Sequence, residues 1–319
     1  MTGRVLITGA TGFLGGALVR LMADRPLLAQ GRNAARLAGL GVPGLHWDLT
    51  APPPDMAELA GVDSILHCAA LSAPFGRLAE FRAANVTGTA AVIALARRLK
   101  VRRLVHISSP SVLFAPCDQL DLDEGAPLPP PYTPYARTKA EAEALVLAAP
   151  DLSPVILRPR GLYGAGDTAL LPRLLQAARS RPLPLFRDGA ARIDLTHVED
   201  AARAAIAALD AGPEAGGQIF HISGGEVLPV SRIATAACAR AGVPLRWRRL
   251  PLPPVLFAAG AMERLALMTT GREPVATRYG LALFAYAQSL DISKARRLLG
   301  WSPRISFAEG LERSFRGAP

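Results

Sequence analysis

The chain has 319 residues, of which 50% are hydrophobic and 19% are charged, so it can bury a substantial core and is not intrinsically disordered. Its formal net charge is +10, yet it holds only three lysines and its densest basic stretches, residues 97–103 and 246–249, are short, which argues against nucleic-acid binding. The three cysteines stand far apart without a CxxC pair, so neither a disulfide framework nor a metal site is expected, and a reducing cytoplasm fits.

Two features bear on membranes and targeting. The first expected strand starts at about Arg4, which leaves no room for a secretory signal peptide. No run of 18 apolar residues occurs, and the stretch that comes nearest, residues 255–268, is interrupted by Glu263 and Arg264. We therefore expect no integral membrane segment, while peripheral membrane contact by this stretch stays open.

The first element is an apolar run, residues 4–8, followed directly by the glycine-rich stretch 9–15 and then by apolar residues at helical spacing. This order predicts a strand, a glycine turn and a helix. In that setting Gly9 permits a tight turn, Gly12 lets the backbone approach a pyrophosphate, and Gly15 lets the helix pack on the strand. A dinucleotide site is therefore expected, the alternative being a tight turn without a ligand.

The second strand is expected at residues 26–30, followed by Gly31, Arg32 and Asn33. In NAD-selective sites an acidic residue ends this strand, whereas an arginine can accommodate the 2′-phosphate of NADP. Because Gly31 occupies the acidic position and Arg32 follows it, the sequence favours NADP over NAD. The alternative is that Arg32 merely points to solvent.

Two further strands are expected at residues 44–49 and 62–70. Asp48 ends the first and could accept a hydrogen bond from an adenine amino group, while Ala69 and Ala70 end the second and leave space for a ribose. The alternative for Asp48 is a strand-end cap without a ligand, and the alternative for Ala69 and Ala70 is tight packing. His67 is expected to be a core or strand-end histidine, since no carboxylate or metal partner is visible near it.

The next elements are a helix over residues 85–99 and a strand over 103–109 that ends in Ser108 and Ser109. Strands and helices alternate through this whole half of the chain, which predicts a doubly wound parallel sheet with its ligand at the carboxyl ends of the strands. The serine pair falls at such an end.

A helix then carries Tyr135 and Lys139, four positions apart and therefore on the same face. A tyrosine hydroxyl beside a fixed cation can exchange a proton with a substrate oxygen, since a positive charge favours the phenolate. Alone, such a pair is more often an ordinary surface pair, and its place after the serine-ended strand is what indicates catalysis.

Together these residues resemble the extended short-chain dehydrogenase/reductase superfamily, which is the NAD-dependent epimerase/dehydratase superfamily. Residues 8–15 resemble its TGxxGxxG fingerprint, and Tyr135 and Lys139 its catalytic pair. The other similar motifs are Asp48-Leu49, residues 67–70, 85–89 and 157–159, Tyr163 to Asp167, His197 to Asp200, Asp291 to Lys294, and Leu299 to Pro303. The resemblance implies a Rossmann-type α/β fold with a smaller C-terminal substrate-binding lobe.

The resemblance also implies the roles of site residues. Ser109 would bond the substrate oxygen, Tyr135 would act as general acid or base, and Lys139 would hold the nicotinamide ribose and lower the pKa of the tyrosine. NADP or NAD would be bound by Gly9, Thr11, Gly12, Phe13, Leu14, Arg32, Asn33, Asp48, Leu49, Ala69, Ala70, Ile107, Ser108, Tyr135, Lys139, Pro159 and Leu162. Substrate contacts are expected from Leu71, Ser111, Gly161 and Arg192.

Several stretches, among them residues 108–112, 167–175 and 273–279, are similar to the branch that contains 3β-hydroxysteroid dehydrogenases and 2-alkyl-3-oxoalkanoate reductases. The competing branch is that of nucleotide-sugar epimerases, dehydratases and reductases, which usually carry a diphosphate-gripping asparagine where this chain has Gly161. The resemblance therefore favours an apolar, steroid-like or 3-oxoacyl substrate, in a pocket expected to contain Leu71, Leu113, Phe114, Leu162, Phe257 and Leu283. A binding protein without turnover is a more distant alternative.

The expected organisation is a dinucleotide-binding domain over residues 1–167 and a mixed region over 168–319, which completes the sheet at about 190–225 and otherwise forms the substrate lobe. The family often forms homodimers through two helices per subunit, here the helix after Asn85 and the one bearing Tyr135. A homodimer is therefore expected by resemblance.

Overall fold

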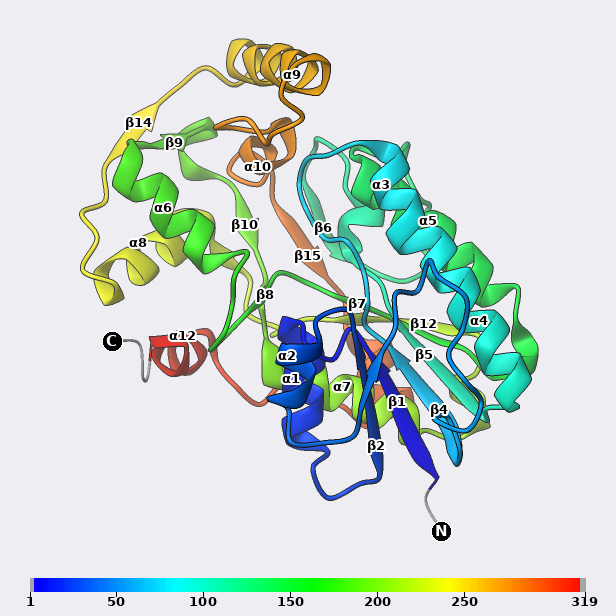
Figure 1. Ribbon diagram of the computed structural model, residues 1–319. Helices are drawn as coiled ribbons and strands as arrows, with labels where there is room; N and C mark the ends of the chain where they lie inside the picture. The colour runs from blue at the N-terminus through cyan, green and yellow to red at the C-terminus, as the bar shows by residue number, and fades with distance from the viewer. Residues whose placement is uncertain (1–2, 316–319) are drawn as a thin grey trace.

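The core of the protein is a seven-stranded sheet in the order β12-β7-β5-β4-β1-β2-β3 (Figure 1). The computed structural model describes residues 3–315, and every pair in this sheet is parallel. The strands are β1 (Arg4–Thr8), β2 (Leu27–Gly31), β3 (Gly44–His46), β4 (Val62–His67), β5 (Arg103–Ile107), β7 (Val155–Pro159) and β12 (Gln218–Ile222). The strand order reverses at β1, which confirms the predicted Rossmann-type sheet.

Helices cover both faces of this sheet. On one face α1 (Phe13–Leu21) and α7 (Val198–Asp210) pack against each other, and on the other lie α4 (Gly88–Leu99) and α5 (Pro134–Leu147). The strands are continuous apolar runs in the sequence because both of their faces are buried. In β1, for example, Leu6 packs into one core and the next residue, Ile7, into the core on the opposite face, and both are fully buried.

The helix expected to begin at Asn85 begins earlier than predicted. It starts as α3 (Leu78–Arg82), passes through a π-helical turn over Ala83–Thr87 and continues as α4. A π-helical turn inserts an extra residue into the helix and often marks a functional position. Here it coincides with Asn85, whose buried side chain holds the loop after β4.

The second half of the chain contributes to both parts of the fold. β12 completes the main sheet and α7 covers one of its faces, whereas a third apolar core joins α6, α8 and α12 in a smaller lobe (Figure 1). The boundary predicted at residue 167 stays a prediction. The other elements are α2 (Ala34–Ala38), β6 (Gln119–Leu122), β8 (Leu162–Tyr163), α6 (Leu171–Ser180), β9 (Leu183–Leu185), β10 (Arg192–Ile193), β11 (Thr196–His197), β13 (Leu228–Pro229), α8 (Val230–Arg240), β14 (Trp247–Arg249), α9 (Leu252–Met268), α10 (Arg278–Ala282), β15 (Gln288–Leu290), α11 (Ser293–Leu299) and α12 (Phe307–Phe315).

Within residues 3–315, none of the helices combines the length and the apolar character needed to cross a bilayer.

Candidate active site

The start of α5 places the two residues that the sequence singles out. Thr133 caps the helix, since its Oγ1 accepts a hydrogen bond from Ala136 N at 3.0 Å, and Pro134 occupies the first helical position, where its missing N–H costs nothing. Tyr135 therefore lies in the first turn and Lys139 one turn later. Both meet the carboxyl end of β5, Lys139 at Ile107 and Tyr135 at Ser109.

Lys139 is buried against β5. Its Nζ donates to the Ile107 carbonyl at 2.6 Å and lies 3.2 Å from Nε2 of His106. Burial lowers the pKa of Lys139 to about 8, and the carboxylate of Glu143, one turn further along α5, raises it in part. Near neutral pH the side chain is thus mainly an ammonium, held in place by two acceptors.

The surroundings of Tyr135 differ in one respect from the expectation. Burial raises the pKa of Tyr135, and the groups that lower it are the hydroxyls of Ser72 and Ser109, through side-chain hydrogen bonding. The Lys139 ammonium instead donates to the Ile107 carbonyl and lies beside His106. The predicted lowering of the tyrosine pKa by the lysine stays a prediction.

Three serines follow or lie in the turn after β5, and they differ in their contacts. Ser109 Oγ accepts a hydrogen bond from Ser111 N at 3.2 Å, which leaves its own O–H free to donate. The hydroxyls of Ser108 and Ser111 are buried and have no hydrogen-bond partner among the residues that the structure describes. Of the three, Ser109 is the one that meets Tyr135.

Ser72 was not predicted, although it directly follows the predicted residues Ala69, Ala70 and Leu71. Asn85 fixes this loop: its Oδ1 accepts from Leu71 N at 2.7 Å, and its Nδ2 donates to Leu71 O and to Thr138 Oγ1, both at 3.1 Å. Since Thr138 belongs to α5, Asn85 ties the loop after β4 to the helix that carries Tyr135. Ser72 is thereby brought to the phenol.

The glycine turn has the geometry that its spacing predicts. Gly9 has a φ of +66°, and a Cβ there would stand 2.8 Å from the backbone of Ala69, so no other residue fits. A Cβ on Gly15 would stand 2.3 Å from the Gly9 carbonyl oxygen, which accounts for the close packing of α1 on β1. Gly12 caps α1 without a side-chain hydrogen bond, so the first N–H groups of the helix have no side-chain cap. Thr11 lies in this turn, and Phe13 and Leu14 are the first residues of α1.

At the end of β2, Arg32 is exposed, and its carbonyl is hydrogen-bonded to His46 Nε2 at 3.0 Å. Asn33 Oδ1 accepts from Arg36 N at 2.9 Å and so caps α2. Asp48 is exposed, and its Oδ1 accepts from Thr50 N and Oγ1 at 2.9 and 2.7 Å. These bonds, and the charge of Arg32, hold the pKa of Asp48 below its usual range. Arg32 and Asp48 are therefore close enough to interact.

The remaining predicted residues lie in different surroundings. Leu49 is buried against Gly88 at the start of α4, and Pro159 is the last residue of β7 and is buried in the sheet. Leu162 begins β8. Gly161 has a φ of +48°, and a Cβ there would stand 2.5 Å from Leu195 Cδ2. Arg192 is exposed on β10, and none of the described contacts connects it with Tyr135.

An aromatic group lies next to the catalytic pair, and of its members only Phe114 was predicted from the sequence as a pocket residue. The rings of Tyr132 and Tyr279 pack on Phe114 with centroids 5.0 and 5.1 Å apart, and Arg278 lies 5.4 Å above the Tyr132 ring. Tyr279 also acts electrostatically on Tyr135. Phe257 departs from the expectation of a pocket residue, because its side chain is 81% exposed on α9.

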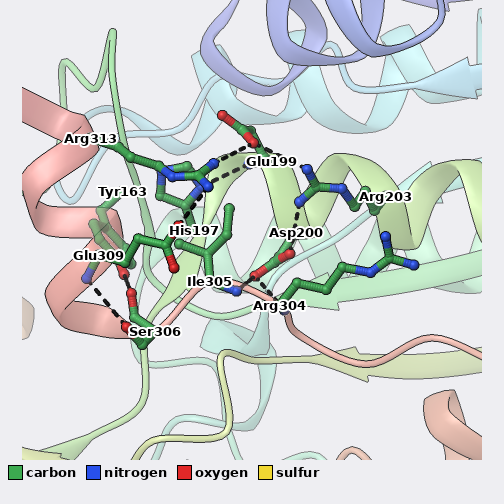
Figure 2. Close-up of polar contacts among 10 residues, drawn as sticks. All are labelled: Tyr163, His197, Glu199, Asp200, Arg203, Arg304, Ile305, Ser306, Glu309 and Arg313. Atoms are coloured by element: carbon green, nitrogen blue, oxygen red, sulfur yellow. Dashed lines mark hydrogen bonds and ion pairs between the residues drawn. The ribbon is translucent and has the colours of Figure 1, made fainter. Parts of the chain in front are cut away.

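The motif that begins at His197 has a structural role (Figure 2). The buried carboxylate of Asp200 accepts from the backbone N–H groups of Arg304 and Ile305 at 3.0 and 2.9 Å, and Glu199 bridges Arg203 and Arg313. The first turn of α7 thus fixes the segment that leads into α12.

Two buried histidines beside Lys139 make stability depend on pH. Burial and the nearby Lys139 lower the pKa of His67 from 6.5 to about 3, and that of His106 lies well below its ordinary value. The folded state therefore binds fewer protons than the unfolded state below pH 6.5. We expect the free energy of unfolding to fall as the pH drops from about 6.5 toward about 3, by up to about 1.4 kcal/mol per pH unit for each histidine.

The measurement is urea unfolding at several pH values within this window, with His67→Gln beside the wild type. Removing the imidazole also removes its hydrogen bonds to Thr8 and Thr89 Oγ1, at 2.7 and 2.9 Å, so the variant should be less stable overall. Its stability should nevertheless vary less steeply with pH. Equal slopes for the two proteins would contradict the assignment of His67 as a buried neutral group.

Comparison with known proteins places the chain among nicotinamide-dependent enzymes. Residues 5–223 match the model of the NAD dependent epimerase/dehydratase family. A 2-alkyl-3-oxoalkanoate reductase from Stenotrophomonas maltophilia (strain K279a) is 36% identical over 327 residues, covering 97% of this chain and 98% of the relative. A 4-hydroxy-2-methyl-3-oxo-4-farnesyl-3,4-dihydroquinoline-1-oxide ketoreductase from Stigmatella aurantiaca is 33% identical over 319 residues, covering 97% and 95%.

Among solved structures, the UDP-glucuronic acid 4-epimerase from Bacillus cereus in complex with UDP-glucuronic acid and NAD superimposes with a TM-score of 0.77. The two chains are 23% identical, and 98% of each is covered. At this identity the likeness shows the shared fold.

Proposed function

Since this chain belongs to the NAD dependent epimerase/dehydratase family and is an oxidoreductase of the extended short-chain dehydrogenase/reductase type, we propose that it interconverts a hydroxyl and a ketone on an apolar substrate with NADP(H). The observation that carries the proposal is the meeting of the Tyr135 and Ser109 hydroxyls at the carboxyl end of β5, one turn from the ammonium of Lys139. This is the edge of a doubly wound sheet where ligands bind.

The glycine turn fits a dinucleotide. The first turn of α1 offers N–H groups without a side-chain cap, and a Cβ on Gly12 would meet only the Gly9 carbonyl oxygen, at 3.1 Å, so the space beyond it is open. Such N–H groups, with the positive end of the helix dipole, suit a pyrophosphate. When bound, the cofactor supplies or accepts the hydride. Arg32 would hold the 2′-phosphate, and Lys139 the nicotinamide ribose.

The proposed proton transfer uses groups of this chain alone. In the reducing direction the Tyr135 hydroxyl gives its proton to the substrate oxygen, while the Ser109 O–H donates a hydrogen bond to the same oxygen. The Ser111 N–H donates to the Ser109 oxygen and holds it in position, and Ser72, in the loop after β4, hydrogen-bonds to the phenol. The oxidising direction uses the same groups, with Tyr135 accepting the proton.

The surroundings of Gly161 support an apolar substrate over a nucleotide sugar. A side chain at this position would collide with Leu195, so the diphosphate-gripping asparagine of the sugar branch could not be placed here without moving a buried leucine. The aromatic rings of Phe114, Tyr132 and Tyr279 next to Tyr135 offer apolar surface in its place. The named activities of the relatives, on 2-alkyl-3-oxoalkanoates and a farnesylated quinoline, support the same proposal.

The cofactor preference is tested by following the fluorescence of Trp47, Trp247 and Trp301 during titration with NADPH and NADH. We expect NADPH to bind more tightly and Arg32→Ala to lose about 10- to 100-fold in NADPH affinity, the effect of removing one hydrogen bond to a charged group. NADH affinity should be unchanged. Arg98→Ala, at an exposed arginine on α4 far along the chain from this turn, is the matched control.

Equal affinities for NADPH and NADH would overturn the assignment of Arg32. Binding of either cofactor only in the presence of a sugar nucleotide would instead favour the epimerase branch. If the preference for NADPH holds, screening should begin with hydrophobic ketones and 3-oxoacyl compounds.

Pairing of two copies through α4 and α5 is a further part of the proposal, and it rests on the family resemblance alone. Light scattering coupled to gel filtration would test it directly, since a monomer at micromolar concentration would contradict it.

A further inference from the structure

Helix α9 exposes an apolar face that no other part of residues 3–315 covers. Of its 17 residues only Ala259 is buried. Phe257, Leu265 and Met268 stand at i, i+8 and i+11, hence on one side of the helix, and are 81%, 62% and 83% exposed. Met262 and Ala261 are also exposed, and the only charged residue on this side is Arg264. Large contiguous apolar patches on a protein surface mark interaction sites.

The opposite side of α9 is held by α10, which fixes the orientation of the apolar face. Glu263 accepts a hydrogen bond from Arg278 N at 2.8 Å. Gly260 allows the stem of the same arginine to pass close by, since a Cβ there would stand 3.1 Å from Arg278 Cδ. Figure 1 shows α9 at the outer edge of the smaller lobe, beside α10 and away from the main sheet. The exposed face is thus presented outward from a packed helix.

The segment of the chain that contains α9 has a net positive charge. Residues 245–278 contain six arginines and two glutamates, a net charge of +4. Both glutamates have partners, Glu263 the Arg278 N–H and Glu273 the guanidinium of Arg173 at 2.7 Å. Arg248, Arg264 and Arg272 are exposed, and none of the described ion pairs involves them. We call these three exposed arginines the arginine rim. An exposed apolar helix face in the same segment as the arginine rim complements a surface that is apolar inside and anionic outside.

We propose that α9 is the membrane-contacting element of this protein and that it seats its Phe257, Leu265 and Met268 face in the surface of a bilayer containing anionic lipid. Apolar side chains of such a helix enter the boundary between headgroups and acyl chains, while the rim arginines meet lipid phosphates. From α9 the packing leads to α10, whose Tyr279 belongs to the aromatic group next to Tyr135. Membrane contact would thereby bring the smaller lobe, and with it the site at Tyr135, to the phase in which apolar compounds dissolve.

The test is co-sedimentation of the full chain with vesicles of phosphatidylcholine and phosphatidylglycerol in a roughly 7:3 ratio, compared with phosphatidylcholine alone. We expect the triple variant Phe257→Ser, Leu265→Ser, Met268→Ser to lose at least about tenfold in vesicle affinity, because three exposed apolar side chains no longer enter the bilayer. The matched control replaces three other exposed apolar residues, Leu120, Leu128 and Val227, with serine and should bind as the wild type does.

A second pair of variants tests the arginine rim. Arg248→Gln with Arg264→Gln should weaken binding to the anionic vesicles by about fivefold for each arginine, and added salt should have a similar effect. Arg20→Gln with Arg98→Gln removes the same charge from α1 and α4 and should have little effect. These exposed substitutions leave the buried core intact, so circular dichroism should show folded proteins.

Three results would overturn the proposal. One is a wild type that does not sediment with either kind of vesicle. The second is equal loss of binding in the α9 variants and their controls. The third is a change of oligomeric state in the triple variant without vesicle binding by the wild type, which would assign the face to a second copy of the chain. None of these readouts depends on turnover, so failure here is distinguishable from failure of the proposed oxidoreductase function.

Discussion

Replacing Tyr135 with phenylalanine should lower kcat with NADPH and an apolar ketone by about 10²- to 10⁴-fold, the usual contribution of a positioned proton donor. The substitution removes one oxygen and keeps the ring, which lies 6.2 Å from the ring of Phe81. The first turn of α5 keeps its cap at Thr133 and its contacts with β5 through Lys139. Cofactor affinity, measured by tryptophan fluorescence, should therefore change little.

Tyr163→Phe is the matched control. It removes the hydroxyl of another buried tyrosine, and within the described residues this hydroxyl donates only to the backbone oxygens of Ser306 and Phe307, at 3.4 and 3.5 Å. We expect a small loss of stability in this variant and an unchanged kcat. Turnover of Tyr135→Phe within about threefold of the wild type, in a protein that still binds cofactor, would rule out the phenol as the proton donor.

The glycine turn and the shared helix face of Tyr135 and Lys139 were predictable because their placement depends on local structure. A glycine turn between a strand and a helix, and a tyrosine and a lysine one helical turn apart, each follow from a few consecutive residues. The cap at Thr133 and the proline after it then fix where α5 begins. Such short-range rules also fix the parallel sheet, since each strand is an apolar run followed by a helix.

Other parts of the site depend on contacts between distant residues. Ser72 reaches Tyr135 only because Asn85 holds the neighbouring Leu71, and Asn85 itself is turned inward by a π-helical turn that no periodicity announces. The aromatic group joins Phe114 to Tyr279, which are far apart in the chain. The direction of the Lys139 ammonium likewise depends on the β5 backbone and on His106. Local sequence patterns do not reveal such contacts between residues that are far apart in the chain.

The segment 255–268 shows a different limit of sequence patterns. Its composition indicates an apolar helix, and a family resemblance suggested that Phe257 lines the substrate pocket. Which side of a helix is covered depends on what packs against it, and here α10 covers the side of Glu263 and Gly260. Phe257 faces outward as a result.

Replacing Arg158 with leucine should destabilise the protein by about 3–5 kcal/mol, because it leaves the carboxylate of Glu143 buried without its partner. The two side chains form a bidentate pair, with nitrogen to oxygen distances of 2.9 and 2.7 Å, and their exposed fractions are 3% and 4%. Urea unfolding would measure the loss. Arg97→Leu, which breaks the half-exposed pair with Asp151, should cost about 1 kcal/mol or less.

The double variant Glu143→Leu, Arg158→Leu separates the charge of Glu143 from the packing around it. With both charges gone no buried ion lacks a partner, so most of the lost stability should return. Lys139, however, loses the carboxylate that raises its pKa, while the burial that lowers that pKa to about 8 remains. Its ammonium should then lose its proton at a lower pH, and cofactor binding should weaken on the alkaline side of neutrality, where the wild type still binds. If the double variant stays as unstable as Arg158→Leu, the loss comes from packing around the guanidinium, because an unpaired Glu143 can no longer account for it.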